Sequence, residues 1–158
     1  MKILVIDDDD LLRRVVEKVL ILGGHQVLAA ADGALGMAIF RKERPEIVVT
    51  DIIMPEQEGL GTIMMMRRER PEARIIAMSG GGRMGNLDVL EAAHALGSDE
   101  VIAKPFLPRD LLDLINRLVL DPTAAGAKTI HLPPKDPGAT LRHLAAMSHR
   151  ASPSSSHC

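Results

Sequence analysis

Aromatic residues are almost absent from this chain, which contains two phenylalanines and neither tyrosine nor tryptophan. Proteins that bind single-stranded nucleic acids stack the bases on aromatic side chains, so a surface of that kind is disfavoured here. An excess of basic residues is also lacking, because the formal net charge is −2. The composition therefore gives no support to electrostatic attraction between this protein and nucleic acid.

Cysteine and long apolar runs are scarce as well. The only cysteine is Cys158, so no disulfide can form within the chain, and a reducing compartment fits this composition. No apolar run approaches the roughly 18 residues of a membrane-spanning helix. The first residues also lack the layout of a signal peptide. We therefore expect a cytoplasmic protein.

What the chain does have is an alternation of strand-like and helix-like segments. The apolar runs that predict buried strands are Lys2–Ile6, Gln26–Ala30, the run from Ile47 to Asp51, Arg74–Met78 and Glu100–Ala103. The apolar stripes that predict helices are Leu11–Leu20, Ala34–Arg44, Leu60–Arg70, Asn86–Leu96 and Pro108–Val119. Five such repeats predict an α/β domain in which helices cover both faces of a parallel sheet.

The amino-acid composition changes after the fifth helical stripe. From position 121 onward the chain is rich in proline, glycine, alanine, serine and histidine, with one short helical candidate at Ala139–His149. We expect residues 1–120 to form one domain and residues 121–158 to form a mostly disordered, weakly basic tail. The six histidines show no metal-ligand spacing.

Polar residues follow four of the five predicted strands. Asp7 and Asp8 follow the first strand, Asp51 ends the third, Ser79 follows the fourth and Lys104 follows the fifth. Because the carboxyl ends of parallel strands meet at one edge of a sheet, these side chains are expected to share one cleft. Taken singly, the aspartates would be helix or strand caps, Ser79 a turn residue and Lys104 a solvated charge. Their joint placement favours a functional site.

Three carboxylates in one cleft repel one another unless a cation lies between them. A hard divalent ion that prefers oxygen ligands, above all Mg²⁺, would satisfy that charge. Asp51 could then act as a nucleophile toward phosphorus. Lys104 and the Ser79 hydroxyl would stabilise negative charge on the phosphoryl oxygens.

In these motifs the sequence resembles the response-regulator receiver domains of bacterial two-component signalling, of the stand-alone chemotaxis type. The matching pieces are Ile3–Asp9, Val49–Pro55 with Gly59, Ala77–Gly80 and Ala103–Phe106, and together they cover residues 1 to about 120. The resemblance implies a flavodoxin-like, doubly wound (βα)5 fold with a parallel five-stranded sheet in the order 2-1-3-4-5. No output domain is expected, because residues 122–158 are too short and too poor in apolar residues to form one.

The resemblance also implies roles for individual residues. Asp51 would accept a phosphoryl group from a histidine kinase or a histidine phosphotransfer protein, in a phosphorelay that changes conformation and partner binding. Asp7, Asp8, Asp51 and the backbone carbonyl of Ile53 would hold Mg²⁺, while Ser79 and Lys104 would contact the phosphoryl group. A downstream protein partner would bind through the fourth helix, the fifth strand and the fifth helix. Neither direct nucleic-acid binding nor enzyme activity beyond phosphoryl uptake and loss is expected.

One position and one segment depart from the pattern of the family. Many receivers carry an aromatic residue three positions before the lysine, where this chain has Val101, so the usual aromatic rotamer switch is missing. The segment Gly80–Gly85 is long and glycine-rich, and it could order on phosphorylation or simply be a flexible insertion.

Two other interpretations stay open at this point. In a haloacid-dehalogenase-type phosphatase, Asp7 would be the nucleophile and Asp9 the general acid, but the motif around Asp51 would then have no explanation. A receiver-like scaffold could instead bind its partner without phosphorylation, and Val101 leaves room for that interpretation.

Overall fold

The structure is a computed structural model that describes residues 1–54, 59–80, 86–120 and 129–131. The loop expected from Met54 to Glu58, the glycine-rich segment after Gly80 and the helical candidate at 139–149 lie wholly or mostly outside the described residues. Within the described part of the chain, no helix is long and apolar enough to cross a membrane.

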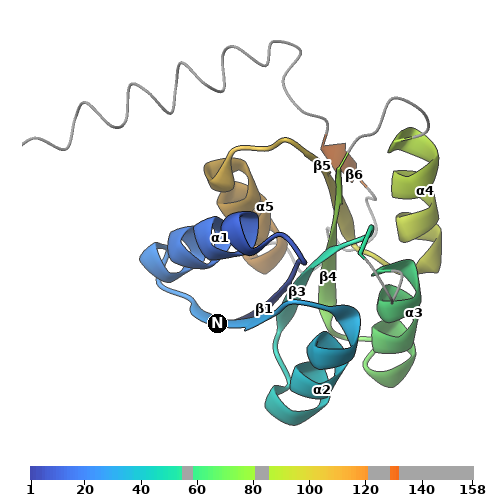
Figure 1. Cartoon of the computed structure of the whole chain (residues 1–158), viewed down its shortest axis with the longest axis horizontal. Coiled ribbons are helices and arrows are strands. Elements are labelled where there is room, and N and C mark those ends of the chain that lie inside the picture. The colour runs from blue at the N-terminus through green and yellow to red at the C-terminus, as the bar shows by residue number, and fades with distance from the viewer. Residues whose placement is uncertain (55–58, 81–85, 121–128, 132–158) are drawn as a thin grey trace, which may run out of the picture.

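Strands and helices alternate along the described chain, as the sequence predicted (Figure 1). The strands are β1 (Lys2–Ile6), β2 (Gln26–Ala30), β3 (Ile47–Asp51), β4 (Arg74–Gly80), β5 (Glu100–Lys104) and β6 (Thr129–His131). The helices are α1 (Asp10–Leu22), α2 (Gly33–Glu43), α3 (Gly59–Glu69), α4 (Asn86–Leu96) and α5 (Pro108–Leu120).

The sheet has the order β2-β1-β3-β4-β5-β6, and all of its neighbouring strands are parallel. The predicted order 2-1-3-4-5 is thus confirmed for the first five strands. The sixth strand, Thr129–His131, was not predicted, because the sequence analysis assigned these residues to a disordered tail. Three residues in a segment rich in proline and glycine carry no recognisable period.

Helices cover both faces of the sheet, and each face has its own apolar core. The core on one face joins β-strand residues to Val16 and Leu20 of α1 and to Leu111 and Ile115 of α5. The opposite core joins other strand residues to side chains from α2, α3 and α4, including the fully buried Phe40. Figure 1 shows α1 and α5 on one side of the sheet and α2, α3 and α4 on the other. Residues Ile3–Ile6 of β1 and all of β3 are buried on both faces, as expected of central strands in a parallel sheet.

Local caps fix where two of the helices begin. The Asp9 side chain accepts hydrogen bonds from the backbone N–H groups of Leu11 and Leu12 at the start of α1. The Asp32 side chain accepts one from Leu35 at the start of α2. Aspartate is among the strongest N-cap residues, so these starts follow directly from the sequence.

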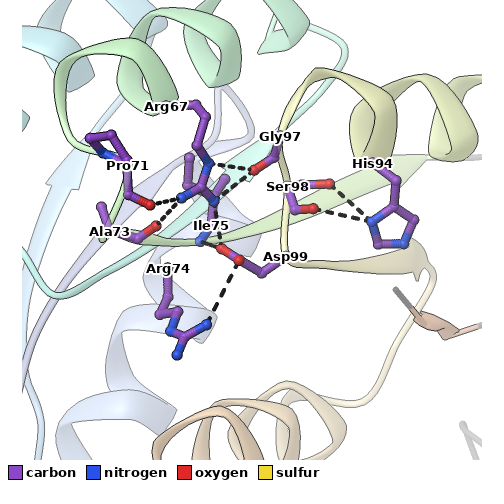
Figure 2. A network of polar contacts seen from close by, with 9 residues as sticks. All are labelled: Arg67, Pro71, Ala73, Arg74, Ile75, His94, Gly97, Ser98 and Asp99. Carbon is purple, nitrogen blue, oxygen red and sulfur yellow. Dashed lines mark hydrogen bonds and ion pairs between the residues drawn. The ribbon is translucent and has the colours of Figure 1, made fainter. Parts of the chain in front are cut away.

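At the edge of the sheet where the strands begin, the guanidinium of Arg67 in α3 links several elements (Figure 2). Its Nε and Nη2 donate to the Gly97 carbonyl at 2.9 and 2.7 Å, and Nη2 also donates to Asp99 Oδ2 at 2.7 Å. Nη1 donates to the carbonyls of Ala73, at 3.0 Å, and Pro71. Arg67 therefore ties the end of α3 to the end of α4 and to the loops that lead into β4 and β5.

Candidate functional site

The carboxyl ends of β1, β3, β4 and β5 lie side by side in the sheet and carry the predicted site residues. The register pairs Ile6, the residue before Asp7, with Thr50, the residue before Asp51. Asp51 in turn pairs with Met78, and Lys104 pairs with Gly80. Parallel pairing therefore brings residues that are distant in the sequence to one end of the sheet, as the strand-end argument predicted.

The ammonium group of Lys104 bridges two of the three carboxylates. Lys104 Nζ donates to Asp7 Oδ2 at 2.8 Å and to Asp51 Oδ2 at 2.6 Å. Both carboxylates are buried, with Asp7 fully inaccessible and Asp51 6% exposed. Such charge-assisted hydrogen bonds, removed from solvent, hold the three groups in a fixed arrangement.

Backbone N–H groups hold the other oxygen of each carboxylate. The amide of Asp9 donates to Asp7 Oδ1 at 2.9 Å, and the amide of Ile53 donates to Asp51 Oδ1 at 3.1 Å. Each donor lies two residues beyond its acceptor, so the loop that follows each strand fixes the orientation of the carboxylate at the carboxyl end of that strand. The carbonyl of Ile53 as a metal ligand stays a prediction.

Burial and charge act in opposite directions on this group. Burial raises the pKa of the Asp7 carboxyl above its ordinary value, and the hydrogen bond from Lys104 opposes that rise only in part. For Lys104, burial alone would lower the pKa, but the hydrogen bonds to Asp51 and Asp7 outweigh it and the pKa is raised. The ammonium is therefore stable as a cation, while the buried Asp7 would gain from a further positive charge.

The chemistry of the donor set fits a divalent cation. Asp7, Asp8 and Asp51 can each offer one carboxylate oxygen such that these oxygens all lie within 4.8 Å of one another. Asp8 is exposed, so the cluster has a side open to solvent. Hard cations such as Mg²⁺ bind carboxylate oxygens and retain several waters, which suits a cluster with one open side.

Ser79 lies fully buried in β4 with its Oγ unpaired among the residues that the structure describes. A buried hydroxyl without a partner costs free energy, and a hydrogen bond from Ser79 to a ligand oxygen would remove that cost. Val101 is also fully buried, in β5 next to Ala77 of β4. It packs in the core on the side of α2, α3 and α4, so the site has no aromatic side chain at this position.

The sequence analysis missed one contact of the site, which is made by Arg13 of α1. Its Nη1 donates to the Asp7 carbonyl at 2.7 Å. Arg13 also pairs with Asp10 of the first helical turn. An arginine one turn into a helix is too common a feature to reveal such a bond from the sequence.

Comparisons with known proteins agree with this geometry. The family model described as response regulator receiver domain matches residues 3–116 of the chain. The chemotaxis protein CheY of Bacillus subtilis (strain 168) is 32% identical over 117 residues, which cover 73% of this chain and 95% of that protein. The crystal structure of a CheY-like response regulator receiver domain protein from Methanospirillum hungatei JF-1 has a TM-score of 0.70 at 29% identity, covering 75% of this chain and 92% of that chain.

Longer proteins match as well. The probable transcriptional regulator ycf27 of Porphyridium aerugineum is 38% identical over 110 residues, which cover 70% of this chain but 44% of that protein. The chain thus spans about half the length, or less, of the ycf27 relatives it matches.

Proposed function

Because this chain belongs to the family of response regulator receiver domains, we propose that Asp51 accepts a phosphoryl group in a two-component phosphorelay. Receiver domains are signalling domains rather than conventional enzymes, so the phosphorylated state is itself the signal. The donor would be a phosphohistidine of a histidine kinase or of a phosphotransfer protein. One Asp51 oxygen attacks phosphorus, the bond from phosphorus to the histidine nitrogen breaks, and the imidazole retains the electron pair.

The observation that carries this proposal is the bridge from Lys104 to both Asp7 and Asp51. Burying a lysine with two carboxylates at the ends of separate strands carries a desolvation penalty that can exceed the Coulombic gain, so stability alone is weak grounds for this cluster. Lys104 is suited to bind phosphoryl oxygens, because the ammonium already lies 2.6 Å from the proposed acceptor. The unpaired Oγ of Ser79 supports a second contact to the same oxygens.

We also propose that Asp7, Asp8 and Asp51 hold Mg²⁺, with the Ile53 carbonyl as a further ligand. When bound, Mg²⁺ would offset negative charge on the phosphoryl oxygens and reduce repulsion between them and the carboxylates. The role of this chain is to fix the carboxylates in place: Asp7 through the amide of Asp9, and Asp51 through the amide of Ile53.

The phosphatase interpretation gains nothing from the structure. Asp9, its proposed general acid, has its Oδ1 engaged by two backbone N–H groups of α1. Asp51, which that interpretation leaves without a role, lies against Lys104 in the centre of the site.

Readout of the phosphorylated state is proposed to use α4, β5 and α5, as in the family. Lys104 ends β5, so a change in its bonds acts on the strand that contributes to this surface. Since Val101 replaces the aromatic switch, the shift would come from the backbone and from Ser79 rather than from a ring rotation.

The test is incubation with acetyl phosphate and Mg²⁺, followed by intact mass measurement. Wild type should gain one phosphate, Asp51→Asn none, and Asp10→Asn, which alters a nearby exposed carboxylate outside the metal cluster, should behave as wild type. An adduct that survives in Asp51→Asn would refute the assignment of the acceptor. Release of phosphate from a generic phosphate ester that is lost in Asp7→Asn but kept in Asp51→Asn would support the phosphatase interpretation instead.

The phosphorylation-independent scaffold has its own test. Once a partner is identified, its affinity for wild type should change on addition of beryllium fluoride with Mg²⁺ and should not change for Asp51→Asn. Equal affinity under all these conditions would favour the scaffold.

A further inference from the structure

The outer edge of β5 is occupied by a segment of the same chain. An edge strand presents backbone N–H and C=O groups that accept another strand. Here β6 pairs with β5 in parallel, with Glu100 opposite Thr129, Val101 opposite Ile130 and Ile102 opposite His131. In Figure 1, β6 lies at the end of the sheet, next to β5.

One side-chain pair accompanies this backbone pairing. His131 Nε2 lies 3.2 Å from Oε2 of Glu100, a residue that is only 7% exposed. Across the residues that the structure describes, no other hydrogen bond or ion pair reaches the Glu100 carboxylate. Burying a carboxylate at a sheet edge without a hydrogen-bond donor costs free energy. The strand that covers Glu100 therefore has to supply a donor to its carboxylate.

We propose that the outer edge of β5 is a strand-binding surface for an extended protein segment that carries a basic or imidazole side chain able to reach Glu100. Thr129–His131 is the occupant that the chain itself supplies. A partner segment would pair with the same backbone groups and would displace β6. This inference does not depend on phosphoryl chemistry at Asp51.

The size of β6 makes such an exchange feasible. A strand of three residues forms few ladder hydrogen bonds, each worth about 1 kcal/mol net. Its advantage over a free segment is its attachment to the chain, which corresponds to an effective concentration of about millimolar. A partner segment that forms a longer ladder, reaching Ala103 and Lys104 beyond the β6 register, would compete with it.

Glu100 would discriminate among partner segments because a strand that leaves its buried carboxylate unpaired loses binding free energy. A strand without a donor would bury the carboxylate unpaired, whereas a histidine, lysine or arginine in the position of His131 would satisfy it. The surface therefore favours basic extended segments over acidic or purely apolar ones.

The experiment uses the full chain and a synthetic peptide of residues 126–134 with blocked ends. Ile130→Pro removes a backbone donor and should displace β6, so that those amides of Glu100–Ile102 that point toward β6 rather than β4 exchange hydrogen about tenfold faster or more. The peptide should restore their protection in this variant and should add little in wild type, where β6 already covers the same amides. Thr140→Pro, outside the strand, is the control and should leave these amides unchanged.

A second peptide tests the role of the charge. The same peptide with alanine in place of His131 should fail to protect Ile130→Pro, and Glu100→Gln added to that chain should abolish the difference between the two peptides. Unchanged exchange in Ile130→Pro would show that β6 does not cover the edge. No protection by the histidine peptide would show that the edge takes no strand in trans, and equal protection by both peptides would refute selection by Glu100.

Discussion

Gly59, the first residue of α3, lies close to the backbone at the end of β3. A Cβ atom at this position would lie 2.1 Å from the Asp51 carbonyl oxygen and 2.6 Å from the Ile52 Cα. Both are backbone atoms, so neither can move without displacing the end of β3. The close approach explains why the motif around Asp51 includes a glycine here.

We predict that Gly59→Ala lowers the free energy of unfolding by about 1–3 kcal/mol, as overpacking typically does. It should also slow the formation of the phosphate adduct, because the backbone of Asp51 must shift. Gly61→Ala is the matched control on the same helix: apart from its chain neighbours and the backbone of its own helix, no atom lies within 4 Å of the new Cβ. That variant should be neutral or stabilised by up to about 1 kcal/mol. Urea unfolding followed by circular dichroism measures both, and equal stabilities would contradict the packing argument.

His25 is a second residue whose surroundings make a measurable prediction. Its Nε2 is buried without a hydrogen-bond partner among the described residues. Burial lowers the pKa of the imidazole, and the nearby N-terminal ammonium adds to this effect. The folded protein therefore keeps the ring neutral under conditions in which the unfolded chain takes up a proton.

The direction in which pH changes the stability follows from the difference between the pKa of His25 in the folded and the unfolded state. The contribution of His25 to stability is complete above the unfolded pKa, about 6.5, and is lost as the pH falls through the lower folded pKa. The urea midpoint of wild type should drop further between about pH 7.5 and pH 5 than that of His25→Leu, which cannot titrate at this position. Equal drops in the two proteins would show that His25 does not sense pH.

At the scale of the elements, the Arg67 network connects α3 with α4 and with the starts of β4 and β5 (Figure 2). Asp99 Oδ2 accepts from Arg67 and from the Ile75 amide, both at 2.7 Å. Gly97 has a φ of +119°, and the Arg67 side chain packs on it so closely that a Cβ there would lie 2.9 Å from Arg67 Cγ. The planar guanidinium thus binds the end of α4 through geometry that lysine cannot reproduce.

We predict that Arg67→Ala lowers the free energy of unfolding by about 2 kcal/mol, because hydrogen bonds from a charged group are lost and partial exposure limits their worth. Arg67→Lys should recover only a minor part. Arg68→Ala, which changes the exposed neighbour on the same helix, should stay within about 0.5 kcal/mol of wild type. A loss in Arg68→Ala as large as in Arg67→Ala would mean that the network has no special role.

At the scale of the whole molecule, the carboxylate cluster joins β1 to β3 at one end of the sheet. Mg²⁺ held by Asp7, Asp8 and Asp51 would bind the folded state and not the unfolded chain. Stability should therefore rise with metal concentration, by about 2.7 kcal/mol at a hundredfold excess over the dissociation constant.

Thermal unfolding with Mg²⁺ and with EDTA measures this effect. The midpoint of wild type should fall when the metal is removed. Asp8→Asn, a change at an exposed residue of the cluster, should abolish most of the difference, while Asp10→Asn should preserve it. A shift that persists in Asp8→Asn would place the ion elsewhere, and no shift in wild type would refute the metal site.

The sequence by itself determined the local structure. The buried strands β1 and β3 contain the continuous apolar runs Ile3–Ile6 and Ile47–Val49, and Asp9 and Asp32 cap helix starts with their own side chains. Such elements can be recognised from neighbouring residues. The strand-end argument also brought Asp7, Asp51, Ser79 and Lys104 to one edge, because in a parallel sheet the chain direction alone places these ends together. The roles assigned to those residues remain predictions.

Only the tertiary structure decided the contacts between elements. The sharing of Lys104 between Asp7 and Asp51, the bond from Arg13 to the Asp7 carbonyl and the network around Arg67 depend on packing distances that no local pattern encodes. The strand Thr129–His131 is the clearest case, since its three residues are too few for a periodic signal and are ordered by an edge that exists only once β5 is in place.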